Sequence, residues 1–184
     1  MEINYKIIFF SDWHCGSGLA KGSDVDALTV KDKDGLPYVP GKTVKGLLRE
    51  ALESIAEYSG NNCSQSINEL FGFFDDKDKH QKGSLFFSNA VIPDGDRKGM
   101  LENGWVKFLY GRRANTAIEG GTAKRTSLRA SEVCMPCTLE GKILDLPSEM
   151  KPAIENGMRF IKRLGVGRNR GLGRCKFEII NTNE

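Results

Sequence analysis

The sequence predicts an α+β fold of the ferredoxin-like (RRM-like) kind, with the order strand, helix, strand, strand, helix, strand. Runs of β-branched and aromatic residues at 3–10 and 176–180, near the two ends of the chain, are typical of strands. Between them, two segments with helical spacing of apolar residues flank two further strand-like segments, at 83–92 and 128–143. The chain of 184 residues is long enough to bury a core. We therefore expect one ferredoxin-like βαββαβ domain over 1–184, with loop insertions and a thumb-like insertion at about 93–126.

The first half of the chain begins with the strand 3–10 and continues into a polar loop, 11–34, rich in glycine and aspartate. Thr43 is placed to cap the first helix and Gly60 to end it. Apolar residues recur in this helix at helical spacing, at Val44, Leu47, Leu48, Ala51, Leu52 and Ile55.

In the second half, the strand 83–92 leads into a predicted loop, 93–104, and then into a polar, basic insertion at 111–126. Ser148 is placed to cap the second helix, and Pro152 falls in its first turn, where the missing N–H costs little. The side of this helix expected to face the core comprises Met150, Ile154, Met158 and Ile161.

The charge of the chain is small overall, at +3, but it is unevenly distributed. Seven Lys and Arg residues and no acid fall within 159–176, and six fall within 107–129 against Glu119 alone. Such segregation is typical of a nucleic-acid-binding surface, although two solvated loops would give the same pattern. The five cysteines are odd in number and irregularly spaced, which indicates reduced thiols of a cytoplasmic protein. No apolar stretch approaches the length of a membrane span, so we expect no membrane contact.

The segment 165–174 is the clearest candidate binding loop. Its glycines allow close approach to a ligand, and its arginines carry planar donors suited to phosphate. No Gly-Lys-Ser/Thr follows, so it is not a Walker loop, and a strand rather than a helix comes after it. A sugar-phosphate backbone is the expected ligand. The loop contains Gly165, Gly167, Arg168, Arg170, Gly171, Gly173 and Arg174.

A second basic group lies on the first predicted helix. Lys42, Lys45 and Arg49 are spaced i, i+3, i+7 and therefore form one stripe. Free N–H groups in the first turn would also favour an anion there. An ordinary solvated face is the alternative.

Cys134 and Cys137 invite comparison with a zinc site. Strand alternation would put the two thiols on opposite faces, where they share no metal unless Pro136 breaks the strand. A second Cys-x-x-Cys pair is missing, and Cys63 and His80 are the only distant candidates. We therefore expect core thiols and no zinc.

Three residues after the first strand could serve catalysis. His14 could act as a general base on a ribose 2′-hydroxyl, but a structural role in the loop is favoured. Asp24 and Asp26 could hold Mg²⁺ through water or orient a hydroxyl for attack on phosphate. Solvated turn aspartates would look the same in sequence.

Four stretches, taken in order, resemble the RAMP superfamily of CRISPR-associated proteins, and specifically the backbone subunit of type III effector complexes. The stretch after the first strand is His-Cys-Gly-Ser-Gly, and the helix is preceded by Leu-Pro-Tyr-Val-Pro-Gly. The four stretches are 14–18, 26–46, 121–129 and 165–174.

The resemblance implies a row of such subunits, together with other effector subunits, that grips a guide RNA paired to a target RNA. The thumb, here 107–125, would flip bases out of the duplex at intervals. In catalytic members a loop aspartate assists metal-dependent cleavage of the target, and the alignment puts Asp26 there with Asp24 close by, so Mg²⁺ or a similar ion is the expected cofactor. The RNA contacts expected from the basic segments and the resemblance are Lys42, Lys45, Arg49, Arg112, Arg113, Lys124, Arg125, Gly165, Gly167, Arg168, Arg170, Gly171 and Gly173.

Three functions follow from these residues. The first is a guide-RNA-binding subunit that also cleaves target RNA through Asp26. The second is a non-catalytic binding subunit of the same fold. The third is a guide-processing endoribonuclease with His14 as general base, although such enzymes usually carry two ferredoxin-like halves and this chain supplies one.

Overall fold

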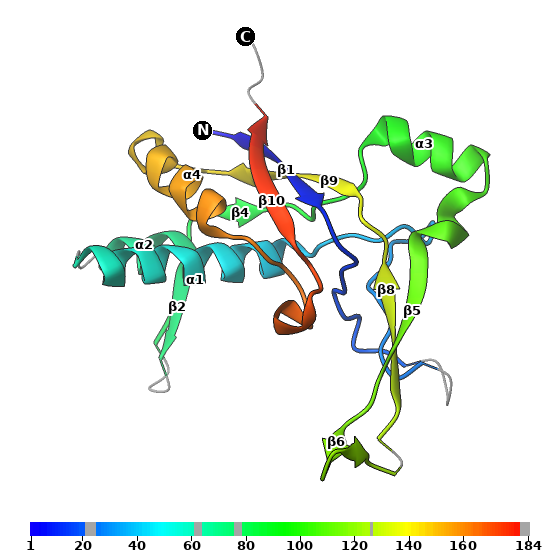
Figure 1. The fold of residues 1–184 in the computed structure, drawn as a ribbon. Coiled ribbons are helices and arrows are strands. Elements are labelled where there is room, and N and C mark those ends of the chain that lie inside the picture. The colour runs from blue at the N-terminus through cyan, green and yellow to red at the C-terminus, as the bar shows by residue number, and fades with distance from the viewer. Residues whose placement is uncertain (21–24, 61–63, 76–78, 126, 181–184) are drawn as a thin grey trace.

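The computed structural model of the chain describes all residues except 21–24, 61–63, 76–78, 126 and 181–184. Its centre is a four-stranded antiparallel sheet in the order β10-β1-β9-β4. Helices α1 and α4 cover one face of this sheet (Figure 1). This arrangement confirms the predicted ferredoxin-like fold. The elements are β1 (Ile3–Phe9), α1 (Gly41–Ser59), β4 (Phe86–Phe87), β9 (Thr138–Leu144), α4 (Lys151–Phe160) and β10 (Cys175–Ile180).

The core lies between the sheet and the two helices. In β1 every second side chain is buried, as a half-buried strand requires. The helices approach closely because α4 has Gly157 at the contact, where a Cβ would lie 2.8 Å from the Cδ1 of Leu48 on α1. Of the predicted core side of α4, Ile154, Met158 and Ile161 are buried and Met150 is partly buried.

The ends of the helices differ in part from the prediction. Helix α1 begins at Gly41, whose N–H donates to the Oδ1 of Asn89 at 2.9 Å, so the predicted cap at Thr43 is wrong. The end at Gly60 is confirmed, with a left-handed φ of 68°. Ser148 lies in a short 3-10 turn, η2 (Ser148–Met150), and does not cap α4, so the predicted cap at Ser148 is wrong. Pro152 lies in the first turn of α4 as predicted.

The prediction of a loop at 93–104 is wrong. This segment contains helix α3 (Asp94–Glu102), which is followed by the 3-10 turn η1 (Trp105–Leu109). No residue of α3 is buried, so no apolar period marks it in the sequence. Arg97 attaches this helix to the polar loop that follows β1, by ion pairs with Asp32, at 2.6 Å, and with Asp34. Burial alone would raise the pKa of Asp32, but hydrogen bonds from Arg97 and nearby backbone lower it.

Two hairpins project from the same side of the molecule (Figure 1). In the larger, which we call the thumb, β5 pairs antiparallel with β8, and two short strands pair near its tip. The smaller follows α2. The elements are α2 (Ser64–Phe71), β2 (Gly72–Asp75), β3 (Lys79–Lys82), β5 (Tyr110–Asn115), β6 (Ile118–Glu119), β7 (Thr122–Ala123) and β8 (Arg129–Cys134).

The two predicted inner strands are shorter than expected. Only β4 forms in 83–92, supplemented by single bridges at Ala90 and Val91. The segment 128–143 breaks at 135–137 into β8 and β9. Because of this break, strand alternation does not extend from Cys134 to Cys137, and each thiol is the largest influence on the pKa of the other, which corrects the prediction that the two thiols lie on opposite faces of one strand.

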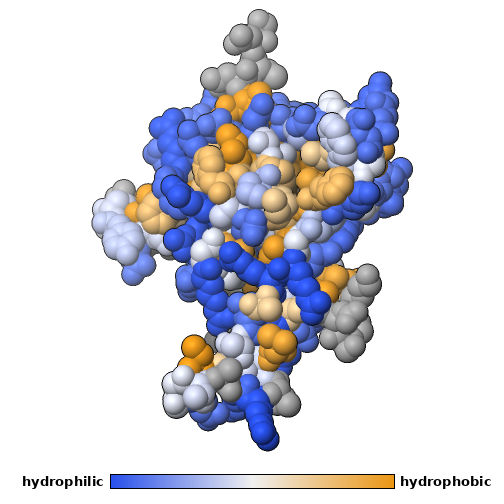
Figure 2. Space-filling model, turned by 45° about the vertical axis from the view of Figure 1, so that its right-hand side comes forward, coloured by the Kyte–Doolittle hydropathy of each residue, from blue (hydrophilic) through white to orange (hydrophobic). Residues whose placement is uncertain are grey.

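Hydrophobic side chains also gather on the surface. Figure 2 shows them in the upper half of the face that brings α3 forward, surrounded by hydrophilic ones. Phe10, Phe86 and Val91 are exposed, and strand register places Phe86 and Val91 on the sheet face away from α1 and α4. Within the described ranges, no helix is both long and apolar enough to cross a membrane.

One buried hydroxyl provides a test of the core. Tyr5 is fully buried opposite Gly141, where a Cβ would lie 2.5 Å from the Tyr5 Oη, and this oxygen has no hydrogen-bond partner among the described residues. Tyr5→Phe should therefore raise the free energy of unfolding by about 1 kcal/mol, measured by urea denaturation. Leu139→Ala, which removes a buried apolar side chain from the same sheet, should lower it by about 3 kcal/mol. A loss of stability in Tyr5→Phe would mean that the hydroxyl has a partner.

Candidate nucleic-acid interface

The glycine-rich loop leads from α4 to β10 and contains the 3-10 turn η3 (Arg168–Arg170). Gly167 and Gly171 flank the turn with left-handed φ angles of 77° and 84°. Gly165 and Gly173 also have positive φ, and a Cβ on either would collide with a backbone carbonyl. The positive φ favours glycine at all four positions, and at Gly165 and Gly173 the close approach of a backbone carbonyl requires it as well.

The loop is held by the extended segment that follows β1, which we call the linker segment (residues 12–16). The N–H of Val166 donates to the His14 carbonyl and that of Gly173 to the Asp12 carbonyl, both at 2.8 Å. Trp13, between them, exchanges hydrogen bonds of 2.7 and 2.9 Å with Cys134 on the thumb. The linker segment thus joins the glycine-rich loop on one side and the thumb on the other.

The arginines of the loop stay at the surface. Arg170 and Arg174 are exposed, and Arg168 forms a loose ion pair with Glu50 on α1, at 3.6 Å. Arg163, just before the loop, donates to the carbonyl of Arg168. A phosphate could therefore reach guanidinium groups here without breaking a buried contact.

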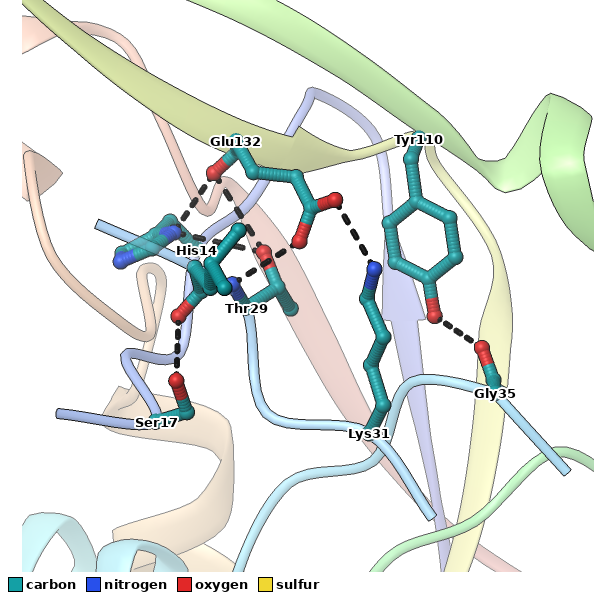
Figure 3. A network of polar contacts seen from close by, with 8 residues as sticks. His14, Ser17, Thr29, Lys31, Gly35, Tyr110 and Glu132 are labelled. Atoms are coloured by element: carbon teal, nitrogen blue, oxygen red, sulfur yellow. Dashed lines mark hydrogen bonds and ion pairs between the residues drawn. The ribbon is translucent and has the colours of Figure 1, made fainter. Parts of the chain in front are cut away.

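A polar network, drawn in Figure 3, connects His14 to the thumb. His14 is 4% exposed, and its Nδ1 lies 2.6 Å from the carbonyl oxygen of Glu132 on β8. A carbonyl only accepts, so Nδ1 carries the proton in this contact. The Thr29 hydroxyl lies 3.3 Å from the same nitrogen. These contacts agree with the structural role favoured for His14.

Glu132 also anchors residues 25–35, which we call the aspartate-rich loop. Its carboxylate accepts from the N–H of Thr29 at 3.1 Å and pairs with the Lys31 Nζ at 2.8 Å (Figure 3). Lys31 lies 3.8 Å above the ring of Tyr110, whose hydroxyl donates to the Gly35 carbonyl at 2.6 Å. Burial, with smaller contributions from nearby acidic groups, raises the pKa of Tyr110. Sequence reasoning missed the roles of Thr29, Lys31, Tyr110 and Glu132, because partners far apart along the chain leave no local pattern.

Asp26 lies beside the start of β8. Its N–H donates to the Ala130 carbonyl, and its Oδ2 accepts from the Ala130 N–H, both at 2.8 Å. Its Oδ1 lies 3.9 Å from a guanidinium nitrogen of Arg129, and the side chain is 46% exposed. The carboxylate is therefore fixed against the thumb, at the end of the β5–β8 pairing that lies nearer the tip, and it is open to solvent. Asp24 lies outside the described residues.

The residues predicted to form one basic stripe on α1 have different surroundings. Lys42 is exposed, whereas Lys45 donates to the Leu85 carbonyl at 3.3 Å. Burial, together with Lys82 and Arg49, lowers the pKa of Lys45. Arg49 is bonded to Glu53, Gly72 and Asn68, at 2.7 to 2.8 Å. Arg49 thus holds α2 and β2 against α1, and a contact with RNA stays a prediction.

The thumb presents several of the predicted basic residues. Arg112 and Arg113 are on β5, and Lys124 pairs with Glu119 near the tip at 3.1 Å. Arg125 is exposed and follows β7.

Two cavities bring the predicted segments together. One, of about 130 Å³, lies between thumb and loop and is lined in part by His14, Arg113, Asn115, Ser131, Gly167 and Arg170. The other, of about 420 Å³, lies between loop and helix and is lined in part by His14, Lys42, Gly46, Glu50, Gly165 and Arg168. His14 borders both, so a ligand lying along the loop would pass from α1 to the thumb.

The side chains that the structure describes form no ready-made cluster of metal ligands. No group of three or more His, Cys, Asp or Glu side chains lies together among them. Cys63, one distant zinc candidate, is outside the described residues, as is the side chain of His80. Asp26 offers one carboxylate, which suits Mg²⁺ only if RNA oxygens and water complete its shell.

Comparison with known proteins agrees with this architecture. No curated protein sequence matches the chain. Among solved structures, a chain of the apo type III-B Cmr-beta complex superposes with a TM-score of 0.71 at 11% identity, covering 99% of this chain and 98% of that one. A chain of the same type of complex bound to cognate target RNA superposes with a TM-score of 0.70 at 10% identity, covering 97% of each. At these identities the likeness shows the fold.

The structural likeness shows the fold but not the family, and a match to a family model identifies the family. The model of the RAMP superfamily matches residues 6–176. This match runs from within β1 to within β10, and it therefore includes the sheet, the thumb and the glycine-rich loop. The chain belongs to the RAMP superfamily.

Proposed function

We propose that the chain is a guide-RNA-binding subunit of a type III CRISPR effector complex and that it works in the cytoplasm beside copies of itself and other subunits. The observation that carries this proposal is the junction of the glycine-rich loop, the start of α1 and the thumb around His14. Three segments distant in sequence present Lys42, Arg113 and Arg170 to neighbouring cavities. Similarity to chains of the two Cmr-beta complexes supports the assignment.

The junction suits the sugar-phosphate backbone of RNA better than its bases. Arginine and lysine groups dominate its charge, and backbone glycines permit close approach. Pairing between guide and target would carry the sequence information. The projecting thumb would insert into the guide–target duplex and displace a base.

The exposed apolar residues support assembly. Phe86 and Val91 on the open sheet face, and the exposed Phe10, would be covered by neighbouring subunits in an assembled complex.

We further propose that Asp26 takes part in cleavage of the target RNA. Its carboxylate is fixed beside the thumb, where a displaced nucleotide would lie. There it would orient a 2′-hydroxyl for in-line attack on the adjacent phosphate. When bound between Asp26 and RNA oxygens, Mg²⁺ would neutralise charge on that phosphate.

One observation favours a non-catalytic subunit. The Asp26 carboxylate already accepts from the Ala130 N–H and lies near Arg129, contacts that would suffice for a purely structural aspartate.

Arginines at the junction provide a binding test. Arg113→Ala and Arg170→Ala should each weaken binding of the chain to single-stranded RNA about tenfold, because each removes one charge-assisted contact with a phosphate. Each should also make the slope of affinity against salt shallower by about one, measured by fluorescence anisotropy. Lys98→Ala on the exposed face of α3 is the matched control and should change little. Equal effects in all three variants would contradict the proposed path.

Substitution of Glu50 should increase RNA affinity, whereas substitution of the arginines should decrease it. Its loose ion pair with Arg168 competes with a phosphate for the same guanidinium. Glu50→Gln should therefore strengthen RNA binding about two- to threefold, since exposed ion pairs are weak. In the Arg168→Ala background the same change should have less effect. A decrease in affinity on Glu50→Gln alone would overturn the placement of the phosphate beside Arg168.

Cleavage is tested in the complete complex. The complex is reconstituted on a guide, supplied with labelled complementary RNA and Mg²⁺, and its products are separated on a gel. Wild type should give a ladder of evenly spaced products, which Asp26→Asn abolishes while guide binding is retained. Asp96→Asn on α3 is the matched control and should cleave normally. Intact RNA with the wild type would leave the non-catalytic subunit as the function.

A further inference from the structure

The corner between β8 and β9 has a cysteine at each end. Cys134 ends β8 and is 0% exposed, whereas Cys137 is partly exposed. Between them Met135 and Pro136 are exposed, so the corner lies at the surface. The proposed RNA-binding function uses neither thiol.

Backbone contacts hold both cysteines against one stretch of chain. Cys134 exchanges two hydrogen bonds with Trp13, and the Cys137 carbonyl accepts from the Phe9 N–H at 3.0 Å. The indole of Trp13 also donates to the Met135 carbonyl at 3.1 Å. The fold thus fixes both cysteines at one corner, three positions apart, where each thiol is the largest influence on the pKa of the other.

The two thiols of this pair differ in reactivity. Their mutual influence raises the pKa of Cys134 and lowers that of Cys137. The partly exposed thiol is thus the more readily ionised, as an attacking thiol should be. Cys15 and Cys175, in contrast, are buried, and burial raises the pKa of each to about 12.

We propose that Cys137 and Cys134 form a reversible dithiol–disulfide site that reacts with low-molecular-weight disulfides such as glutathione disulfide. The Cys137 thiolate attacks one sulfur of the reagent, breaks its S–S bond and releases one thiolate, leaving a mixed disulfide. The Cys134 sulfur then attacks the Cys137 sulfur, gives up its proton to water and expels the second thiolate. The protein loses two electrons and two protons, and the reagent becomes two thiols.

The test uses the full chain with Cys63→Ser as parent, because Cys63 lies outside the described residues. The reduced protein is treated with glutathione disulfide, free thiols are alkylated, and peptides are mapped by mass spectrometry. The parent should lose two thiols and yield a link between Cys134 and Cys137, which dithiothreitol reverses. Cys134→Ser should retain a glutathione mixed disulfide on Cys137, and Cys137→Ser should retain neither product.

A second measurement needs no cysteine variant. Native reduced protein is alkylated over time, and Cys137 should react before Cys15 and Cys175. In a Trp105→Phe background, the fluorescence of Trp13 should fall on oxidation, because a disulfide would form beside its indole. Equal alkylation rates, or a parent that forms no 134–137 link, would overturn the proposal. Neither outcome bears on RNA binding.

Discussion

The arrangement of the whole surface depends on backbone hydrogen bonds to the linker segment, residues 12–16. Successive residues of an extended chain offer their N–H and C=O groups to opposite sides. Asp12 and His14 therefore accept from the glycine-rich loop, while Trp13 bonds to Cys134 on the other side. The linker segment thus brings the glycine-rich loop and the thumb close together, although these two are not paired with each other in a sheet.

A second set of contacts holds the aspartate-rich loop against β8 and the linker segment. Residues 26–29 lie alongside β8, and the N–H of Val30 donates to the Cys15 carbonyl at 2.8 Å. Glu132 connects the thumb to the linker segment and to the aspartate-rich loop, because its backbone carbonyl bonds to His14 and its carboxylate bonds to Thr29 and Lys31. Strand β8 of the thumb thus positions Asp26, and the buried side chains of His14 and Thr29 both have hydrogen-bond partners.

Periodicity in the sequence was sufficient to predict β1, β10 and both covering helices, whereas the two inner strands were predicted too long. It did not reveal α3, which buries no residue and depends on Arg97 for attachment. It also put Cys134 and Cys137 on opposite faces, because alternation applies only while a strand continues, and Pro136 lies in the break. Of the candidate site, the segments were predictable from charge and glycine content. Glu132 was not, since its role depends on contacts with residues more than a hundred positions earlier.

The linker segment has a further consequence for a row of such subunits. Because main-chain bonds set the separation between loop and thumb, that separation does not vary with the side chains that line either surface. Every copy would hold its thumb at the same offset from the guide. The spacing between successive thumbs would then be set by the main chain. Residues on the proposed RNA-binding surface could change without altering the interval at which the thumbs meet the RNA.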